Sequence, residues 1–529
     1  MKGLSVEGLT VRLPPGADRA FAVEEVSLSV APGEILCVVG ESGSGKSVTA
    51  SAVMGLLAPG LSVTGGRMSL SGEDLRVKTP EEWRSLRGRR IAMVFQEPMT
   101  ALNPLMTVGR QIGETWRTHL GLDAREASRR ALDALREVNL PDPEGALRAF
   151  PHELSGGQRQ RVMIAMALAL NPEVLVCDEP TTALDVTTQA QVIALIKELQ
   201  RRHGTAVLFI THDFGVVAEI ADRVAVMQHG RVVEQGTASE VLTAPRHAYT
   251  QALLAAVPGR SAPPPRELSS DIVLEVSGLT KTYASRRLFR RRKPVRALDN
   301  VSLALRRGST LAVVGESGSG KSTLARCVVR LLGTDGGEVR VAGAPLPKGR
   351  RAAAGLVQMV FQDPYASLNP RRTAGAQVAQ GPIATGTPRR EAMAEARRLF
   401  GLVGLDPESV LRFPHEFSGG QRQRIGIARA LAMQPSVLVA DEPVSALDVS
   451  VQAQVLALLR ELQGQLGLSI LFITHDLRVA AQLCDEVVVM RNGVVEEQGP
   501  IREVFEAPRH PYTRSLIEAI PGRRLMGVR

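Results

Sequence analysis

Two long parts of this chain repeat each other. Residues 40–47 (Gly-Glu-Ser-Gly-Ser-Gly-Lys-Ser) return unchanged at 315–322, and residues 152–161 return at 415–424 with one substitution. Shorter runs recur in the same order: Asp-Glu-Pro at 178–180 and 441–443, and Ile-Thr-His-Asp at 210–213 and 473–476. The distance between matching runs, for example from residue 40 to residue 315, is far longer than the roughly 20–50 residues that separate solenoid repeats. The sequence therefore predicts two tandem copies of one domain.

The length and composition agree with two globular domains. The chain has 529 residues, of which 44% are hydrophobic and 22% charged, so each half can bury a sizeable core. We predict domain one over residues 1–260, a Pro-rich linker over 261–270 and domain two over 271–529. The four cysteines show no C-x-x-C spacing, which predicts small buried apolar side chains rather than disulfides or a zinc site.

Two observations favour a cytosolic location. Apolar runs such as residues 162–170 are shorter than the roughly 20 residues that span a bilayer, and the first residues lack the apolar core of a signal peptide. The net charge of +10 is compatible with nucleic acid, with an anionic membrane or with neither. Seven of the twelve residues at 285–296 are basic, which favours a solvated loop over contact with lipid headgroups.

Short apolar strands alternate with helical patterns in each half. Residues 34–39, 174–177 and 206–210 have the composition of buried strands, a helix is expected from Lys46, and residues 189–202 have helical spacing of apolar positions. This alternation predicts an α/β fold with a mainly parallel sheet. Functional groups should then gather at the carboxyl ends of the strands.

The glycine-rich runs predict phosphate binding. Each fits G-x-x-x-x-G-K-[ST], in which backbone N–H groups surround phosphate oxygens. Lys46 and Lys321 would contact the β- and γ-phosphates, and Ser47 and Ser322 would place a hydroxyl on Mg²⁺. Two copies in a strand–loop–helix context make a chance match an unconvincing alternative.

An acidic pair follows a predicted strand in each half. Alone it is often only a polar strand end, but beside a phosphate loop Asp178 and Asp441 can hold Mg²⁺. The adjacent Glu179 and Glu442 can then accept a proton from the attacking water.

A Ser-Gly-Gly-Gln run precedes a helix in each half, at 155–158 and 418–421. Ser is a good helix N-cap, and the N-terminus of a helix is also an anion site. Because one domain does not need two cradles for one phosphate, we expect each run to serve the nucleotide held by the other half.

The ordered motif set resembles ABC-type ATPase domains. It comprises the phosphate loop, Phe-Gln at 95–96 and 361–362, Ser-Gly-Gly-Gln, Asp-Glu-Pro, Ala-Leu-Asp at 183–185 and 446–448, and Thr-His-Asp. The Leu-Asn-Pro runs at 102–104 and 368–370 and the Arg-His-x-Tyr-Thr tails (246–250 and 509–513) resemble the ATP-binding subunits of bacterial peptide and nickel importers. The fused arrangement is similar to the single-chain ATPases of oligopeptide, glutathione and microcin C uptake.

The resemblance implies two tandem P-loop domains, each with a RecA-like core, an antiparallel β subdomain and a helical subdomain. It implies head-to-tail halves with two ATP molecules and Mg²⁺ between them. In this family Gln96 and Gln362 sense the γ-phosphate and the metal, while His212 and His475 position the γ-phosphate and the attacking water.

The expected site residues fall into three groups. Catalytic residues are Glu179, Glu442, His212 and His475, and the Mg²⁺ ligands are Ser47, Gln96, Asp178, Ser322, Gln362 and Asp441. Nucleotide-binding residues of the first half are Gly40, Ser42, Gly43, Gly45, Lys46, Ser47, Val48, Gln96, Ser155, Gly156, Gly157 and Gln158. Those of the second half are Tyr283, Gly315, Ser317, Gly318, Gly320, Lys321, Ser322, Thr323, Gln362, Ser418, Gly419, Gly420 and Gln421.

The chain departs from the family pattern at two places. The family stacks adenine on an aromatic side chain, a role that Tyr283 fits, whereas the first half offers Leu13. We therefore expect weaker ATP binding at the first site unless Phe21 substitutes. Both tails lack the cysteine cluster of many relatives, so no iron–sulfur cluster is predicted.

The resemblance implies two transmembrane permease subunits, an extracytoplasmic substrate-binding protein and a place on the cytoplasmic face of the bacterial inner membrane, with no nucleic acid. Peptide, nickel, glutathione and peptide-antibiotic cargo stay open, and the import direction rests on resemblance alone. One alternative is a nucleic-acid- or ribosome-associated ABC ATPase, although the short linker and the lack of inserted modules speak against it. Another is a regulatory protein with one inactive half.

Overall fold

The computed structural model describes residues 3–182, 184–257, 267–283, 294–445 and 447–522. The chain divides into two compact units, one built mainly from residues up to Val257 and the other mainly from the residues that follow, up to Ile520. The predicted boundaries at 260 and 271 stay predictions. Residues 261–266 of the predicted linker, most of the basic stretch (284–293), Ala183 and Ala446 lie outside the described residues.

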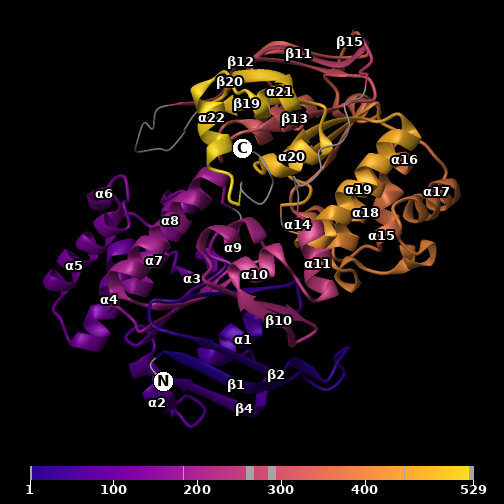
Figure 1. Cartoon of the computed structure of the whole chain (residues 1–529). Helices are drawn as coiled ribbons and strands as arrows, with labels where there is room; N and C mark the ends of the chain where they lie inside the picture. The colour runs from indigo at the N-terminus through magenta and orange to yellow at the C-terminus, as the bar shows by residue number, and fades with distance from the viewer. Residues whose placement is uncertain (1–2, 183, 258–266, 284–293, 446, 523–529) are drawn as a thin grey trace. The chain divides into compact units, whose positions relative to one another are not determined.

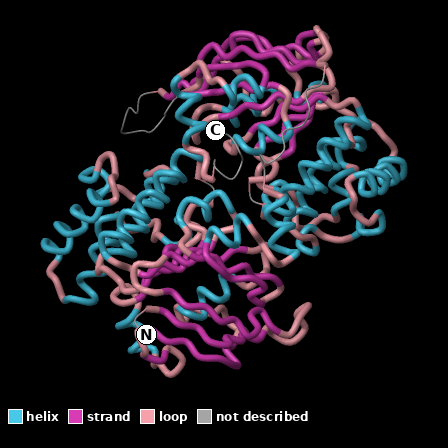
Figure 2. Tube along the Cα trace, viewed as in Figure 1, coloured by secondary structure: helices cyan, strands magenta, loops and turns pink. Residues whose placement is uncertain are grey.

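A six-stranded sheet forms the centre of the first half (Figure 2). Its order is β10-β9-β3-β8-β7-β6, and only β10 runs antiparallel to its neighbour. The strands are β3 (Ile35–Val39), β6 (Ile91–Val94), β7 (Val174–Asp178), β8 (Ala206–Ile210), β9 (Arg223–Gln228) and β10 (Arg231–Thr237).

An antiparallel sheet with the order β2-β1-β4-β5 accompanies the central sheet. Its strands are β1 (Leu4–Arg12), β2 (Phe21–Val30), β4 (Ser62–Leu70) and β5 (Glu73–Asp74). In Figure 1, helices α4 to α7 lie together at the left of this half, and the antiparallel strands lie at its lower end. The helices are α1 (Lys46–Val53), α2 (Pro80–Leu86), α3 (Pro98–Ala101), α4 (Val108–Leu120), α5 (Ala124–Glu137), α6 (Pro143–Arg148), α7 (Gly156–Leu168), α8 (Val186–His203), α9 (Phe214–Ile220), α10 (Ala238–Thr243) and α11 (Ala248–Ala255).

The second half repeats this plan, with sheet orders β16-β17-β18-β13-β19-β20 and β12-β11-β14-β15. Its strands are β11 (Ile272–Tyr283), β12 (Val295–Arg306), β13 (Thr310–Val314), β14 (Gly336–Val341), β15 (Ala344–Pro345), β16 (Val357–Val360), β17 (Val437–Asp441), β18 (Ser469–Ile473), β19 (Glu486–Arg491) and β20 (Val494–Pro500). Its helices are α12 (Lys321–Val328), α13 (Arg350–Ala353), α14 (Pro364–Ser367), α15 (Ala374–Val378), α16 (Gln380–Thr385), α17 (Arg389–Leu402), α18 (Gly419–Leu431), α19 (Val449–Leu466), α20 (Leu477–Leu483), α21 (Ile501–Glu506) and α22 (Pro511–Glu518).

The halves differ where the first has the continuous helix α4. The second half has two shorter helices there, and α15 ends at Val378, four residues before Pro382. Proline has no backbone N–H and its ring clashes with the carbonyl four residues earlier, which explains the break.

The central strands are buried on both faces. Along β3, Ile35, Cys37 and Val39 belong to the core that packs against the helices, whereas Leu36 and Val38 belong to the core shared with the antiparallel sheet. Successive side chains of a strand point to opposite faces, so alternate residues of β3 enter different cores. Because both faces are buried, every residue of the strand is apolar.

The sequence predictions for the fold are confirmed. The strands expected at 34–39, 174–177 and 206–210 are β3, β7 and β8, and the helix expected at 189–202 lies within α8. Both central sheets are mainly parallel, and Cys37, Cys177, Cys327 and Cys484 are free thiols in the core. Within the described ranges, every helix is too short or too polar to cross a bilayer.

Candidate functional site

The phosphate loop of each half joins a central strand to the helix behind it. Residues 40–45 lie between β3 and α1, and residues 315–320 between β13 and α12. The loop lies close to the end of a neighbouring strand, because a Cβ built on Gly40 would lie 2.2 Å from the Met227 carbonyl oxygen. The same contact at Gly315 would be 2.1 Å from Met490 O. Only glycine fits these two positions.

The loop lysine is folded onto its own loop. Lys46 Nζ donates to Gly40 O at 2.7 Å and to Glu41 O at 2.8 Å, and the residue is only 5% exposed. Lys321 Nζ makes the matching bonds to Gly315 O and Glu316 O, both at 2.7 Å. Burial lowers the pKa of Lys321, against the raising effect of nearby carboxylates that include Glu442. The ammonium group is therefore held against the backbone of its own phosphate loop.

The serine that follows each lysine meets the aspartate that ends the neighbouring strand. Ser47 Oγ donates to Asp178 Oδ1 at 3.0 Å, and Ser322 Oγ donates to Asp441 Oδ1 at 3.1 Å. A hydroxyl and a carboxylate are oxygen donors of the kind that Mg²⁺ prefers. Burial raises the pKa of both aspartates, which a bound cation would oppose. The donor chemistry at this point fits the predicted metal.

Three side chains converge on Glu179. Gln96 Nε2 and Thr182 Oγ1 donate to Glu179 Oε2 at 3.0 and 2.9 Å, and His212 Nδ1 lies 3.3 Å from the same oxygen. The backbone of Glu179 has φ 46°, in the left-handed region that a non-glycine residue rarely occupies. Strain of this kind is maintained only where the surrounding structure enforces it.

The second half reproduces this cluster. Gln362 Nε2 donates to Glu442 Oε2 at 2.8 Å, His475 Nδ1 lies 3.2 Å from that oxygen, and Glu442 has φ 47°. The glutamines follow β6 and β16, the glutamates follow β7 and β17, and the histidines follow β8 and β18. All six side chains therefore stand at the carboxyl ends of parallel strands, as the sequence predicted.

The glutamate and the histidine polarise each other. Burial alone would raise the pKa of Glu179, but the hydrogen bond and charge of His212 outweigh it and hold that pKa at about 2. Burial lowers the pKa of His212, yet the neighbouring carboxylate raises it overall. The pKa of Glu442 is lowered and that of His475 raised through the same opposition of burial and pairing. At neutral pH both glutamates are ionised.

The Ser-Gly-Gly-Gln runs begin helices within their own half. Ser155 caps α7: its Oγ accepts the N–H of Gln158 at 3.3 Å, and Gln158 Oε1 accepts the N–H of Ser155 at 2.9 Å. Ser418 and Gln421 form the same box at α18. The N-cap interpretation is thus confirmed, and a role toward the other half's nucleotide stays a prediction.

The residues expected near adenine differ between the halves. Tyr283 ends β11, is 41% exposed, and its Oη lies 3.4 Å from Thr323 Oγ1 in the helix that follows the phosphate loop. In the first half, the Phe21 ring lies 5.7 Å from the guanidinium carbon of Arg12. The second half therefore has an exposed ring beside the helix that follows its phosphate loop, and stacking of this ring on a base stays a prediction.

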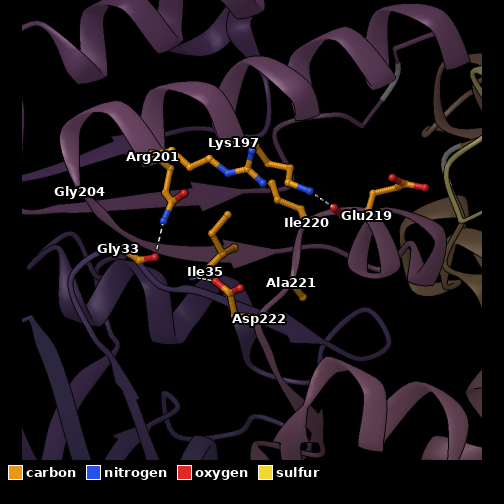
Figure 3. Close-up of a pocket in the computed structure, with 10 residues that line it drawn as sticks. Gly33, Ile35, Lys197, Arg201, Gly204, Glu219, Ile220, Ala221 and Asp222 are labelled. Atoms are coloured by element: carbon orange, nitrogen blue, oxygen red, sulfur yellow. Dashed lines mark hydrogen bonds between the residues drawn. The ribbon is translucent and has the colours of Figure 1, made fainter.

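A cavity of about 340 Å³ lies at the opposite edge of the first central sheet (Figure 3). Gly33 and Gly204 precede the first residues of β3 and β8, and Asp222 Oδ2 accepts the N–H of Ile35 at 2.8 Å. The cavity is therefore at the amino ends of the strands, away from the phosphate loop.

Sequence reasoning missed two kinds of contact. Thr182 and Ser445 each lie three residues after the glutamate and hydrogen-bond to it, Thr182 through its hydroxyl to the carboxylate and Ser445 through its hydroxyl to Glu442 O at 3.2 Å. Tyr249 and Tyr512, from the repeated tails, reach the phosphate loops. In each case the sequence signal for the contact is a hydroxyl side chain that occurs at the same position in both halves.

The glutamate–histidine pairs predict a pH-dependent stability. Because the pKa of His212 and of His475 is raised on folding, their contribution is fully present below the unfolded value near 6.5 and is lost as the pH rises through the raised value. A H212Q/H475Q variant should therefore be more destabilised at about pH 5.5 than at about pH 8.5. Urea midpoints of wild type and variant measure this difference; an equal or larger loss at the higher pH would contradict it.

Comparison with known proteins agrees with this geometry. The model of the ABC transporter family matches residues 23–182 and 298–445, and the model described as "Oligopeptide/dipeptide transporter, C-terminal region" matches residues 233–292 and 496–524. The peptidoglycan transport ATP-binding protein YejF of Agrobacterium fabrum is 46% identical over 528 residues, which cover 98% of this chain and 96% of that protein.

Two further comparisons add a relative and a solved structure. The glutathione import ATP-binding protein GsiA of Escherichia coli O157:H7 is 46% identical over 556 residues, covering 98% of this chain and 89% of that protein. The structure of cbiO1 from Clostridium perfringens, part of the ABC transporter complex cbiONQ, covers 45% of this chain and 92% of its own, with 29% identity and a TM-score of 0.39. With two copies of the family's ATPase domain and relatives that match along nearly its whole length, the chain belongs to the ABC transporter family as an ATP-hydrolysing, ATP-binding protein of the peptide importer group.

Proposed function

We propose that this chain energises the uptake of peptides or peptide-containing compounds through separate permease subunits. The observation that carries the proposal is the duplicated cluster of glutamate, glutamine and histidine beside a phosphate loop, in a chain whose two tails match the oligopeptide/dipeptide transporter model. Relatives named for peptidoglycan transport and glutathione import support a cargo of this class.

The partners and the location follow from the importer assignment. A chain that drives uptake needs permease subunits in the membrane, and we propose two of them, with an extracytoplasmic binding protein that delivers the cargo. The chain would then lie on the cytoplasmic face of the membrane. The matching glutamine, glutamate and histidine side chains in the two halves argue against a regulatory protein with one inactive half.

Each nucleotide would be enclosed by both halves. The first site would combine Lys46, Glu179 and His212 with the Ser418 run, and the second would combine Lys321, Glu442 and His475 with the Ser155 run. Ser47 with Asp178, and Ser322 with Asp441, would hold Mg²⁺, which neutralises developing phosphate charge when bound. ATP would favour the closed arrangement because it contacts both halves, and hydrolysis would release it.

The contacts of Glu179 with Gln96 and His212 support a way in which ATP could control the base. Glu179 at a pKa of about 2 is a weak base, because a general base works best with a pKa near the operating pH. A γ-phosphate would attract the His212 imidazolium and the Gln96 amide. Losing these two partners would raise the pKa of Glu179 and free its oxygen for the attacking water. Substrate would thus activate the base that acts on it.

Changing both glutamates to glutamine separates binding from turnover. E179Q/E442Q should bind ATP with unchanged affinity, while hydrolysis slows by about 10²–10⁴ because the proton acceptor is lost. Calorimetric titration with ATP and steady-state phosphate release measure the two quantities. Normal hydrolysis by the double variant would remove both glutamates from the mechanism.

The cargo proposal has its own test. In a strain that lacks this gene, uptake of labelled di- and tripeptides should return with the wild-type chain and not with E179Q/E442Q. Restored uptake of free nickel but of no peptide would contradict the cargo class.

The aromatic difference predicts unequal sites. Stacking on an aromatic ring contributes about 1–3 kcal/mol per base, so the site that contains Tyr283 should bind ATP about 5–150 times more tightly than the other. Affinity is measured in K46A, which leaves the second site, and in K321A, which leaves the first. Y283L in the K46A background should remove the advantage, and equal affinities in K46A and K321A would contradict this expectation.

A further inference from the structure

The repeated Pro-Arg-His-x-Tyr-Thr tail has no role in the chemistry described so far. In each half it begins the helix α11 or α22, and its tyrosine reaches the phosphate loop of the same half. The N–H of Glu41 donates to Tyr249 Oη at 3.1 Å, and the N–H of Glu316 donates to Tyr512 Oη at 3.2 Å. The same contact between distant residues thus occurs in both halves of the chain.

The tyrosine contacts a peptide group that also holds the loop lysine. The Glu41 N–H belongs to the same peptide as the Gly40 carbonyl, which accepts Lys46 Nζ at 2.7 Å. The second half has the same chain of Tyr512, the Gly315–Glu316 peptide and Lys321, again at 2.7 Å. Hydrogen bonds that share one peptide group polarise one another. A single peptide group therefore links the tyrosine hydroxyl to the lysine ammonium group through two hydrogen bonds.

The rest of the tail fixes where the tyrosine points. The Glu234 carboxylate on β10 accepts the N–H groups of Arg246 and His247 at 2.7 and 3.1 Å. His247 Nδ1 then accepts the N–H of Tyr249 at 3.2 Å, as the N-cap of α11. The corresponding bonds of the second tail, made by Glu497 and His510, lie between 2.9 and 3.2 Å.

The hairpin that carries the glutamate also holds the loop. Gly230, between β9 and β10, donates its N–H to Ser44 O at 3.0 Å, and Gly493 donates to Ser319 O at 2.9 Å. Tail, hairpin and phosphate loop are thus joined by hydrogen bonds in each half. The tail tyrosine holds the first peptide of the loop, and the hairpin glycine holds the serine near the end of the loop.

We propose that Tyr249 and Tyr512 are positioning residues for ATP. Each hydroxyl fixes the first peptide of the phosphate loop in its own half, so that the loop N–H groups and the lysine are preorganised for the phosphates. The tail motif is therefore a support for the nucleotide site. This inference deepens the proposed function and rests on ATP binding by both loops.

The test removes only the two hydroxyls. In the full chain, Y249F/Y512F should raise the Kd and KM for ATP about three- to tenfold, the range of one lost hydrogen bond, while kcat stays within about twofold. Calorimetry with ATP gives Kd, and steady-state phosphate release gives KM and kcat. The single variants Y249F and Y512F should each weaken one of the two ATP-binding events. They test the proposal even if the double variant does not fold.

The matched control removes tail contacts that do not reach the loop. Gln251 Nε2 donates to Pro245 O at 2.9 Å, and an Arg514 guanidinium nitrogen donates to Pro508 O at 3.3 Å. Q251A/R514A should leave Kd and KM unchanged. Unchanged Kd in the phenylalanine variants, a lower melting temperature without a change in Kd, or an equal effect of the control would overturn the proposal. Failure of the wild-type chain to bind ATP would instead refute the proposed function.

Discussion

The chemistry proposed for each half depends on a carboxylate that is held by side chains at the ends of neighbouring strands. Glu179 follows β7, and its partners Gln96 and His212 follow β6 and β8. Parallel pairing sets the ends of these strands level, since Val94 pairs with Cys177 and Asp178 pairs with Ile210. A misplacement of any one strand would separate the three groups. The glutamate, glutamine and histidine therefore meet only when the strands pair in this register.

The polar groups of each site bond to one another and to nearby backbone atoms. The lysine ammonium is bound to loop carbonyls, the serine hydroxyl to the aspartate, and the capping serine to its own helix. Buried polar groups without partners are costly, so this pairing stabilises the fold around the site. A bound ATP would exchange some of these bonds for bonds to phosphate, and its affinity would reflect the free-energy difference between the two sets of bonds. Groups that position the loop, such as the tail tyrosines, act on that difference.

Much of the fold and site could be predicted from sequence because the relevant signals are local. The apolar runs gave β3, β7 and β8, and the phosphate loop needs glycine where a Cβ would collide with Met227 O. The contacts of Tyr249 with Glu41 and of Glu34 with Arg223 join residues about two hundred positions apart in the chain. No spacing rule predicts such pairs, since they depend on how the hairpins and tail pack in three dimensions. The break between α15 and α16 could have been expected from Pro382, whose effect on a helix is local.

In the proposed function, each nucleotide site is completed by the Ser-Gly-Gly run of the other half. In an E179Q/E442Q background, which should retain bound ATP, two pairs of changes separate the possibilities. K46A with S418R damages only the first proposed site, so one ATP per chain should remain after gel filtration. K46A with S155R damages both proposed sites, so none should remain. One ATP retained by the second variant and none by the first would show that each half completes its own site and would contradict the account.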